Sequence, residues 1–444
     1  MCGFFISNNK MQKKSYPKLE ARGPDFSNNL SVNDINFNHT LLSLTGEFTP
    51  QPIVDEDIVC LFNGEIYNAD LKIYSSDIYK IIESYKDEGV NFVGSLDGEF
   101  SLVLFDFKKN ILILATDVFG TKPMHYSFEN QEFGISSYES CLLESGFKKI
   151  NRAKPNETLV YDLKTLDLLN IFNHTEFTLD QSKNNFEDWN NALFLSVEKR
   201  FSDLQCDLLL PLSSGHDSGL ISCILNLLQI PYVSYSINKK EDDNILKERL
   251  SLKSKIFKPE KSFQIDKLNE ADKEMSKYFL EENIDEFYYG SNLEKSSIVS
   301  RGFDDPGAVA LTFLLNDSKK KFPNIKVVAS GQGGDEIYSN LQTYTFNSPN
   351  PLFFDEDLGS IFPWENFYYG SNASYLQKEE YIGGAFGLET RYPLLDKKLT
   401  QEYLSLAPSL KNQEYKSPIS NFLRTYDYPF SQNTKNIFKV GFAG

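Results

Sequence analysis

The stretch LPLSSGHDSGLIS (Leu210–Ser222) joins two segments of different character. Before it lies a continuous apolar run, CDLLLPL (206–212), and after it DSGLISCILNLL (217–228), whose apolar residues have helical spacing. Two further apolar runs, YVSYSI (232–237) and IKVVASG (325–331), follow along the chain. Apolar strands that alternate with helices are typical of a parallel α/β sheet. The stretch therefore predicts a strand, a small polar loop and a helix within such a sheet.

The residues of the loop exclude two common kinds of active-site loop. A nucleophile elbow of the form G-x-S-x-G would need serine at position 217, which is Asp217, and a Walker A loop would need a lysine. What remains is a loop whose amides and the hydroxyls of Ser213, Ser214 and Ser218 lie at a helix N-terminus, an arrangement that binds phosphate. Asp217 is suited to hold Mg²⁺ against that phosphate. Taken alone, the loop is equally compatible with a capped helix that binds nothing.

A second loop of the same kind follows a later strand. The segment VVASGQGGDEIYS (327–339) combines an apolar run, a glycine-rich turn and an acidic pair. Loops at the carboxyl ends of neighbouring parallel strands face one crevice. Asp335 is therefore a candidate second Mg²⁺ ligand across from Asp217.

The first part of the chain has a different pattern. Short β-rich runs are broken by turns, and SDIYKIIESYKDEG (76–89) has helical periodicity with a capped start. We expect an α+β domain of antiparallel sheets over residues 1–175. The polar segment TLDQSKNNFED (178–188) resembles a linker, so a second, α/β domain is expected over 186–444. The β-rich runs are IVCLFNGEIY (58–67), FSLVLFDF (100–107), ILILATD (111–117) and ETLVYDL (157–163).

Composition excludes several classes of protein. The 444 residues carry a formal net charge of -17, which disfavours nucleic acid as a partner because phosphate backbones need clustered cations. No apolar run approaches the ~20 residues of a membrane span, and the start of the chain lacks the pattern of a secretory signal, so we expect none. The five cysteines are scattered, and no pair of the four histidines has metal spacing, so no zinc site is expected. We expect a cytoplasmic protein with free thiols.

The second residue is a candidate nucleophile. In MCGFF (1–5), the small side chain of Cys2 permits removal of the initiator methionine, which leaves a free α-amino group. That amine has a pKa of ~7.7–8.0 and can accept the thiol proton. The segment LFNGEIYN (61–68) offers the Asn63 side-chain amide and the Gly64 backbone N–H as oxyanion donors.

Taken in order, these segments resemble the glutamine-hydrolysing asparagine synthetase family. The resemblance runs from residue 2 to the end of the chain. The segments are MCGFF (1–5), ARGPDFS (21–27), LFNGEIYN (61–68), SLDGEFSLVLFD (95–106), TDVFGTKPMHY (116–126), PLSSGHDSG (211–219), DDPGAVAL (304–311), SGQGGDEIYS (330–339), FGLETRYPLLDKKL (386–399) and KNIFKVGF (435–442).

The resemblance implies two domains and two reactions. The first would be an N-terminal-nucleophile glutaminase with αββα layers, and the second an ATP-pyrophosphatase synthetase with a parallel sheet. Ammonia would pass between them through a tunnel. ATP with Mg²⁺ would adenylate a substrate carboxylate with release of pyrophosphate, and ammonia would displace AMP to form the amide.

The resemblance also implies roles for individual residues. Cys2 would be the glutaminase nucleophile, Asn63 and Gly64 its oxyanion hole, and Asp77 the partner of the glutamine α-amino group. Lys416, in EYKSPISNFLR (414–424), would stabilise charge on the phosphate, whereas Glu389 and Arg391 would first of all shape the synthetase core. The residues implied for ATP and pyrophosphate are Ser213, Ser214, Gly215, Asp217, Ser218, Gly331, Gln332 and Gly333, with Asp217 and Asp335 as Mg²⁺ ligands.

Three positions depart from the family pattern. Leu41 stands where an arginine would hold the glutamine carboxylate, and Arg22 is the nearest alternative in sequence. Ser214 replaces the first glycine of the phosphate loop, and its extra donor is compatible with phosphate binding. Gln332 stands where asparagine-forming members have a glutamate, and a neutral amide cannot take a proton from ammonia. These departures lie where substrates are recognised.

The expected function is therefore a glutamine- and ATP-dependent ligase, with aspartate as the default acceptor. The alternatives are the same chemistry on a carboxylated sugar or secondary metabolite, a β-lactam-synthetase-like ligase with little glutaminase activity, and a non-catalytic homologue kept for binding or regulation. The expected partners are small molecules, with neither nucleic acid nor membrane, and a homodimer is compatible with the sequence.

Overall fold

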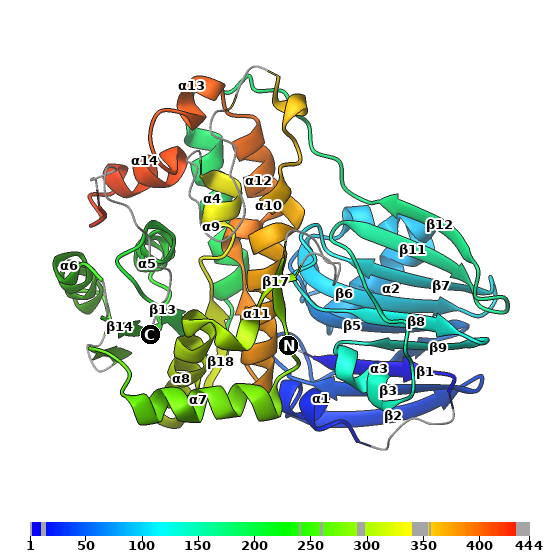
Figure 1. Cartoon of the computed structure of the whole chain (residues 1–444). Coiled ribbons are helices and arrows are strands. Elements are labelled where there is room, and N and C mark those ends of the chain that lie inside the picture. The colour runs from blue at the N-terminus through cyan, green and yellow to red at the C-terminus, as the bar shows by residue number, and fades with distance from the viewer. Residues whose placement is uncertain are drawn as a thin grey trace. The chain divides into compact units, whose positions relative to one another are not determined.

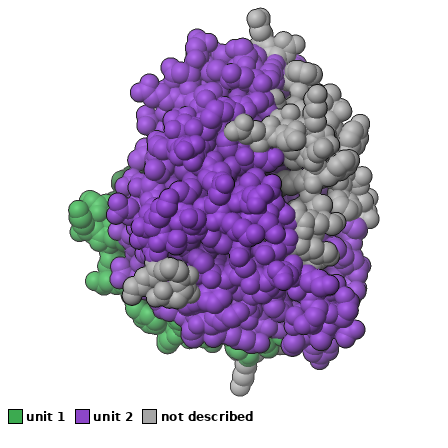
Figure 2. All heavy atoms as spheres, turned by 90° about the vertical axis from the view of Figure 1, so that its left-hand side faces the viewer, with its two compact units in different colours: residues 1–176, 283–285, 383–389 green, residues 177–282, 286–382, 390–444 purple. Residues whose placement is uncertain are grey.

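The chain folds as two units, which Figure 2 colours separately. The computed structural model describes residues 2–9, 15–238, 241–257, 261–290, 298–339, 354 and 357–431. The first unit contains residues 1–176, 283–285 and 383–389, and the second contains residues 177–282, 286–382 and 390–444. The sequence segment KNIFKVGF (435–442) lies outside the described residues.

Two six-stranded antiparallel sheets form the first unit (Figure 1). One has the order β10-β8-β9-β1-β3-β2 and the other the order β12-β11-β7-β6-β5-β4. The strands of the first sheet are β1 (Gly3–Ser7), β2 (Phe26–Val32), β3 (Ile35–Leu41), β8 (His125–Glu129), β9 (Glu132–Ser136) and β10 (Asn151–Arg152). Those of the second are β4 (Ile53–Asp55), β5 (Ile58–Ile66), β6 (Gly98–Asp106), β7 (Ile111–Thr116), β11 (Glu157–Asp162) and β12 (Leu168–Asn173).

Strand β5 contributes to two apolar cores. Val59 and Leu61 pack in the core between the two sheets, together with Phe4 of β1. Cys60 and Phe62 belong to the core on the other face. Successive side chains of a strand point to opposite faces, so a strand that is buried on both faces is apolar at nearly every position. The same strand carries Asn63 and Gly64, and the Asn63 side chain contacts Cys2, the residue before β1.

Helix α2 (Asp77–Glu88) covers the outer face of the second sheet. Ile78, Ile81 and Ile82 pack in the outer core, as their helical spacing predicts. The short helices α1 (Pro17–Arg22) and α3 (Glu139–Glu144) contact the first sheet. The prediction of an α+β arrangement with antiparallel sheets is confirmed for this unit.

A five-stranded sheet with the order β15-β14-β13-β18-β19 forms the centre of the second unit. Strand β13 pairs in parallel with β14 and β18, and β14 pairs in parallel with β15, which confirms the predicted parallel sheet. Because β13 and β18 are neighbours, the loops after them leave the same edge of the sheet. The strands are β13 (Asp207–Pro211), β14 (Val233–Ile237), β15 (Ser262–Ile265), β18 (Ile325–Ala329) and β19 (Glu389–Arg391).

Helices surround this sheet (Figure 1). They include α4 (Glu187–Phe201), α5 (His216–Leu227), α6 (Asp243–Ser254), α7 (Glu270–Asn283), α8 (Pro306–Lys321), α9 (Gly334–Tyr338), α10 (Glu365–Tyr368), α11 (Gly370–Ala385), α12 (Lys397–Leu404), α13 (Pro408–Lys411) and α14 (Ser417–Thr425). A two-stranded antiparallel sheet consists of β16 (Tyr288–Gly290) and β17 (Ile298–Arg301). None of the helices in the described ranges has the length and apolar character needed to cross a lipid bilayer.

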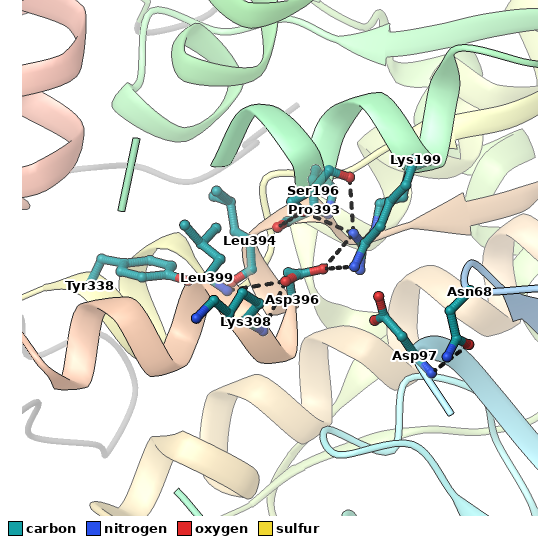
Figure 3. A network of polar contacts seen from close by, with 11 residues as sticks. Asn68, Asp97, Ser196, Lys199, Tyr338, Pro393, Leu394, Asp396, Lys398 and Leu399 are labelled. Carbon is teal, nitrogen blue, oxygen red and sulfur yellow. Dashed lines mark hydrogen bonds and ion pairs between the residues drawn. The ribbon is translucent and has the colours of Figure 1, made fainter. Parts of the chain in front are cut away.

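Asp396 anchors the chain where it leaves the sheet (Figure 3). Its carboxylate accepts hydrogen bonds from the backbone N–H groups of Lys398 and Leu399 at the start of α12. It also forms ion pairs with Lys199 at 2.5 Å and with Arg200 at 2.9 Å, both from α4. Although burial opposes ionisation, Arg200 and Lys199 lower the pKa of Asp396 to about 2.

The pair Glu389 and Arg391 lies in the same region. Both side chains are buried, and Arg391 Nη1 donates to the backbone carbonyl of Arg200 at 2.5 Å. A buried guanidinium that binds a carbonyl of another element fixes the packing of the two elements. This contact agrees with a core-shaping role for Arg391.

Candidate active sites

Cys2 lies immediately before β1 and is 7% exposed. Its backbone nitrogen donates to Asn63 Oδ1 at 3.0 Å, and its carbonyl oxygen accepts from Arg22 Nε at 2.8 Å. The nitrogen is the atom that becomes the α-amine when the initiator methionine is removed. Asn63 and Arg22 therefore fix the main chain of the candidate nucleophile on both sides. Because Arg22 is fully buried in this contact, we assign it a structural role.

The amide nitrogen of Asn63, the predicted oxyanion donor, is a buried group that is unsatisfied within the described residues. An unsatisfied buried donor costs about 1–3 kcal/mol, and a developing oxyanion would satisfy it. The next residue, Gly64, has a φ of +131°, and a Cβ there would lie 1.8 Å from the carbonyl oxygen of Glu99. Only glycine fits the backbone beside this donor.

The Cys2 thiol needs a base. Burial raises its pKa to about 11, with smaller contributions from Glu389 and Glu65, while the positive chain terminus acts in the opposite direction. At neutral pH the thiol is therefore protonated, and an acceptor for its proton has to lie nearby. The predicted acceptor is the α-amine that removal of residue 1 would produce.

The two carboxyl groups that act on Cys2, Glu65 and Glu389, also act on a third carboxyl, Asp77. Asp77 is the first residue of α2, and its Oδ2 accepts from the backbone N–H of Ile66 at 3.1 Å. Burial and the neighbouring Glu65 raise the pKa of Asp77 well above its usual value, and Glu389 adds to this effect. A cationic ammonium group would relieve the repulsion between these carboxyls. Sequence reasoning selected Asp77 but missed Glu65, although Glu65 belongs to the quoted segment LFNGEIYN.

Leu41 lies at the end of β3 and is buried. It offers no charge to a substrate carboxylate, and the Arg22 guanidinium is engaged with Cys2 and with the Tyr138 hydroxyl. The departure from the family pattern at position 41 is therefore not compensated by Arg22.

In the second unit, the loop after β13 is held by its own serines. The backbone N–H of Ser213 donates to Ser218 Oγ at 3.1 Å, and the two hydroxyls lie 2.8 Å apart. The backbone N–H of Gly215 donates to Ser213 Oγ at 3.2 Å, directly before α5 begins. His216 packs its ring against Tyr415, in agreement with a packing role.

Ser214 already binds an anionic group. Its backbone N–H donates to Glu241 Oε2 at 2.6 Å, and its hydroxyl donates to the same oxygen. Two donors that converge on one carboxylate oxygen have the geometry with which a loop binds a phosphate oxygen. Serine at 214 is thus compatible with anion binding, and Glu241 occupies these donors in this conformation.

Arg249 of α6 supports the same loop from behind. Its Nη1 donates to the carbonyl of Ser213 at 2.5 Å and to that of Gly215 at 2.9 Å, and its Nε and Nη2 donate to the carbonyl of Pro429. Arg249 thus fixes the position of the loop through its backbone carbonyls. Gly219 is required here, since a Cβ would lie 2.3 Å from Arg249 Nη2. No sequence motif marks Arg249, and sequence reasoning missed it.

The two predicted Mg²⁺ ligands meet at Lys416. Lys416 Nζ lies 2.5 Å from Asp217 Oδ1 and 2.7 Å from Asp335 Oδ1, and the lysine is fully buried. Its backbone is left-handed, with a φ of +47°, immediately before α14. Such a conformation in a residue other than glycine is strained and is common at functional sites. The Tyr415 hydroxyl donates to Asp335 Oδ1 at 2.9 Å.

Two glycines let the second loop approach the first. A Cβ on Gly331 would lie 2.8 Å from Asp217 Cβ, and one on Gly334 would lie 2.2 Å from Asp217 Oδ1. Gly333 has a φ of +94°. The two carboxylates are hard oxygen ligands, which fit Mg²⁺ when substrate phosphates complete its coordination. In the described ranges no cluster of three or more metal-ligating side chains occurs. Substrate phosphates would therefore be needed to complete the coordination of Mg²⁺.

Gln332 is directed to α11. Its Nε2 donates to Asn372 Oδ1 at 3.3 Å, and its backbone N–H donates to Ser330 Oγ at 3.0 Å. The side-chain amide is neutral and is used as a donor. Gln332 therefore offers no proton acceptor with the strength of a carboxylate.

The chain is similar to known proteins. Residues 1–178 match a family model described as a glutamine amidotransferase domain. A protein of Methanocaldococcus jannaschii named putative asparagine synthetase (glutamine-hydrolysing) 1 is 26% identical, over 86% of this chain and 71% of the relative. A protein of Acanthamoeba polyphaga mimivirus named probable asparagine synthetase (glutamine-hydrolysing) is 25% identical, over 88% and 74% of the two chains.

One solved structure with similarity is glutamine phosphoribosylpyrophosphate amidotransferase from B. subtilis. Its sequence is 15% identical, the match covers 56% of this chain and 64% of that chain, and the TM-score is 0.29.

Proposed function

Because the chain belongs to the glutamine-hydrolysing asparagine synthetase family, we propose that it uses glutamine and ATP to convert a substrate carboxylate into its amide. It is accordingly a carbon–nitrogen ligase with glutamine as the nitrogen donor. The single observation that carries the synthetase half is the convergence of Asp217, Asp335 and Lys416 from three distant segments on one point.

The first unit would release ammonia from glutamine. Cys2 Sγ attacks the carboxamide carbon while its proton passes to the α-amine. The Asn63 side-chain amide and the Gly64 backbone N–H stabilise the resulting oxyanion. Ammonia leaves with the proton, and water hydrolyses the thioester to glutamate. The unpaired Asn63 Nδ2 and the contact of the Cys2 nitrogen with Asn63 Oδ1 support this assignment.

Asp77 and Glu65 would bind the α-ammonium group of glutamine. Both side chains are buried, and the charge of Glu65 raises the pKa of Asp77, so a cation beside the two carboxyls would be favoured. The glutamine carboxylate has no arginine at position 41, so we expect weaker glutamine binding than an arginine clamp would give. A charged hydrogen bond of this type contributes about 1.5–3 kcal/mol.

The second unit would be an ATP-pyrophosphatase domain, from about residue 186 onward, with the first domain ending near residue 175. The Ser213–Ser218 loop and the Gly331–Gly333 turn would hold the phosphates, and Arg249 keeps the first loop in shape. Mg²⁺, when bound, would neutralise phosphate charge next to Asp217 and Asp335. Lys416 would stabilise the charge that develops on the phosphate during adenylation.

Aspartate is the acceptor that the relatives' names suggest. Gln332, a neutral amide in the second loop, is the observation that favours testing other carboxylates as well. Pyrophosphate exchange with ATP, measured separately with aspartate, glutamate and uronic acids, would identify the acceptor. If exchange occurred with another acid and not with aspartate, that acid would be the proposed acceptor.

Two assays test the two halves. Glutamate release from glutamine reports on the first unit, and acceptor-dependent pyrophosphate release from ATP reports on the second. We expect Cys2→Ala to abolish the use of glutamine but to leave synthesis from ammonia intact, with Cys206→Ala as the matched control. Loss of ammonia-dependent synthesis in Cys2→Ala would contradict the two-site assignment. No activity of the wild-type protein in either assay would favour a non-catalytic role.

A further inference from the structure

The amide-forming step needs a proton acceptor. When ammonia attacks an activated carboxylate, the new C–N bond leaves a positive charge on nitrogen, and a proton has to be removed. Gln332 in the second loop cannot act as the base, because its side chain is a neutral amide that donates to Asn372. A carboxylate from another element would have to lie beside this loop.

Helix α11 lies along the loop. Asn372, near the start of this helix, contacts the Gln332 side chain. Glu379 follows seven residues later, which places it two turns along on the same face of the helix. There the Ser330 hydroxyl is its hydrogen-bonding neighbour, and Ser330 Oγ in turn accepts from the backbone N–H of Gln332 at 3.0 Å. The face with Asn372 and Glu379 thus meets the loop at two points.

The Glu379 carboxyl has the properties of a general base. Its Oε2 is buried and has no hydrogen-bond partner among the described residues. Burial raises its pKa to about 7, Ser330 and Lys378 act in the opposite direction, and Glu380 and Glu336 raise it further. A base is most effective when its pKa lies near the working pH.

The charged neighbours of Glu379 have other partners. Lys378 pairs with Asp305 at 3.4 Å. Glu380 accepts from the Tyr392 hydroxyl at 3.0 Å. Glu336 accepts from the backbone N–H of Gly333 at 3.2 Å. Tyr289, which also faces this cluster, donates to Asp305 at 2.5 Å.

We propose that Glu379 accepts the proton that ammonia loses as it attacks the adenylated substrate. This inference rests on the proposed function. The nitrogen lone pair forms the C–N bond, and the C–O bond to AMP breaks with its electron pair on AMP. The nitrogen proton passes to Glu379 Oε2 and then to solvent. Gln332 serves to orient the loop through Asn372.

The test separates adenylation from amide formation. We expect Glu379→Gln to keep pyrophosphate exchange within about twofold of wild type but to lower kcat for ammonia-dependent synthesis by about 100-fold or more. The KM for ATP should not change. With rates expressed per free NH₃, wild type should show a rising limb near pH 7 that the variant lacks. Glu365→Gln, an exposed acid on α10, is the matched control.

A rescue variant sharpens the test. The double variant Glu379→Gln, Gln332→Glu again has a carboxylate beside the loop. Its kcat for ammonia-dependent synthesis should be at least tenfold higher than that of Glu379→Gln alone. If Glu379→Gln melts below the assay temperature, Glu379→Asp, which keeps the carboxylate, replaces it and should retain the rising limb near pH 7.

Two results would overturn the inference. An unchanged kcat for amide formation in Glu379→Gln would exclude a role as the base. A parallel fall of pyrophosphate exchange and amide formation would make Glu379 a structural residue. These results differ from a failure of the proposed function itself. In that case the wild-type protein would show no acceptor-dependent pyrophosphate exchange.

Discussion

Asp217 and Asp335 share one cation: Lys416 Nζ lies 2.5 Å from Oδ1 of the first and 2.7 Å from Oδ1 of the second. Two like-charged carboxylates so close together need a counter-charge, and the fully buried lysine supplies it. In the proposed function this lysine would also stabilise charge on the phosphates, so a structural and a chemical role would coincide at one residue.

Lys416→Met should affect both roles. Removal of one partner of a buried ion pair leaves uncompensated charge, so we expect a loss of unfolding free energy on the order of 3 kcal/mol. Loss of a charge-stabilising donor should lower pyrophosphate exchange by about 100-fold or more. Urea unfolding and the exchange assay measure the two effects, with Lys320→Met as an exposed control. Full exchange activity in the variant would remove Lys416 from the site.

Asn63→Asp tests the oxyanion donor. Aspartate keeps the oxygen that binds the Cys2 nitrogen but loses the Nδ2 donor, and its charge would repel an oxyanion. We expect kcat for glutamate release to fall by about 100-fold or more. Ammonia-dependent synthesis should be unchanged. Asn170→Asp, on the exposed face of β12, is the control, and wild-type glutaminase activity in Asn63→Asp would assign the oxyanion hole elsewhere.

Arg249→Met should loosen the phosphate loop without removing any group that contacts phosphate. The carbonyls of Ser213 and Gly215 lose their common donor, so the amides are no longer held in one orientation. We expect kcat/KM for ATP to fall about 10- to 100-fold, since a misplaced binding group is costly. Steady-state kinetics would measure this, and Lys247→Met on the same helix is the control. Equal kinetics in both variants would contradict the role of Arg249.

The Asp396 cluster predicts a pH dependence of stability. The ion pairs lower the pKa of Asp396 to about 2, below that of an unfolded aspartate at about 3.9. A lowered acid pKa stabilises the fold at pH values above about 4, and this contribution is lost as pH falls through about 2. By the linkage relation it amounts to roughly 2–3 kcal/mol.

Denaturant unfolding of wild type and Asp396→Asn at pH 6 and at pH 2.5 would measure the contribution. We expect wild type to be more stable at pH 6 and the difference between the two proteins to shrink at pH 2.5. A difference that is the same at both pH values would show that the ionisation of Asp396 does not contribute.

The sequence by itself determined the features that local pattern encodes. The apolar run before Leu212 predicts a buried strand, and the spacing after Asp217 predicts the helix that follows, because a strand and a helix repeat over two and 3.6 residues. Strand β13 and helix α5 occur where these patterns lie. Cys2, Asn63 and Asp217 were selected because their chemistry is legible in a few neighbouring residues.

Only the tertiary structure decided which distant side chains meet. Arg249 behind the Ser213 loop, Glu241 on Ser214 and Glu379 beside Ser330 have no local signature, since each contact joins segments that are far apart in sequence. The direction of a side chain depends on the packing of its whole element, which no short pattern records. The charges that balance one another at such contacts come together only when the chain folds. For this reason the partners of the two loops could be identified only from the tertiary structure.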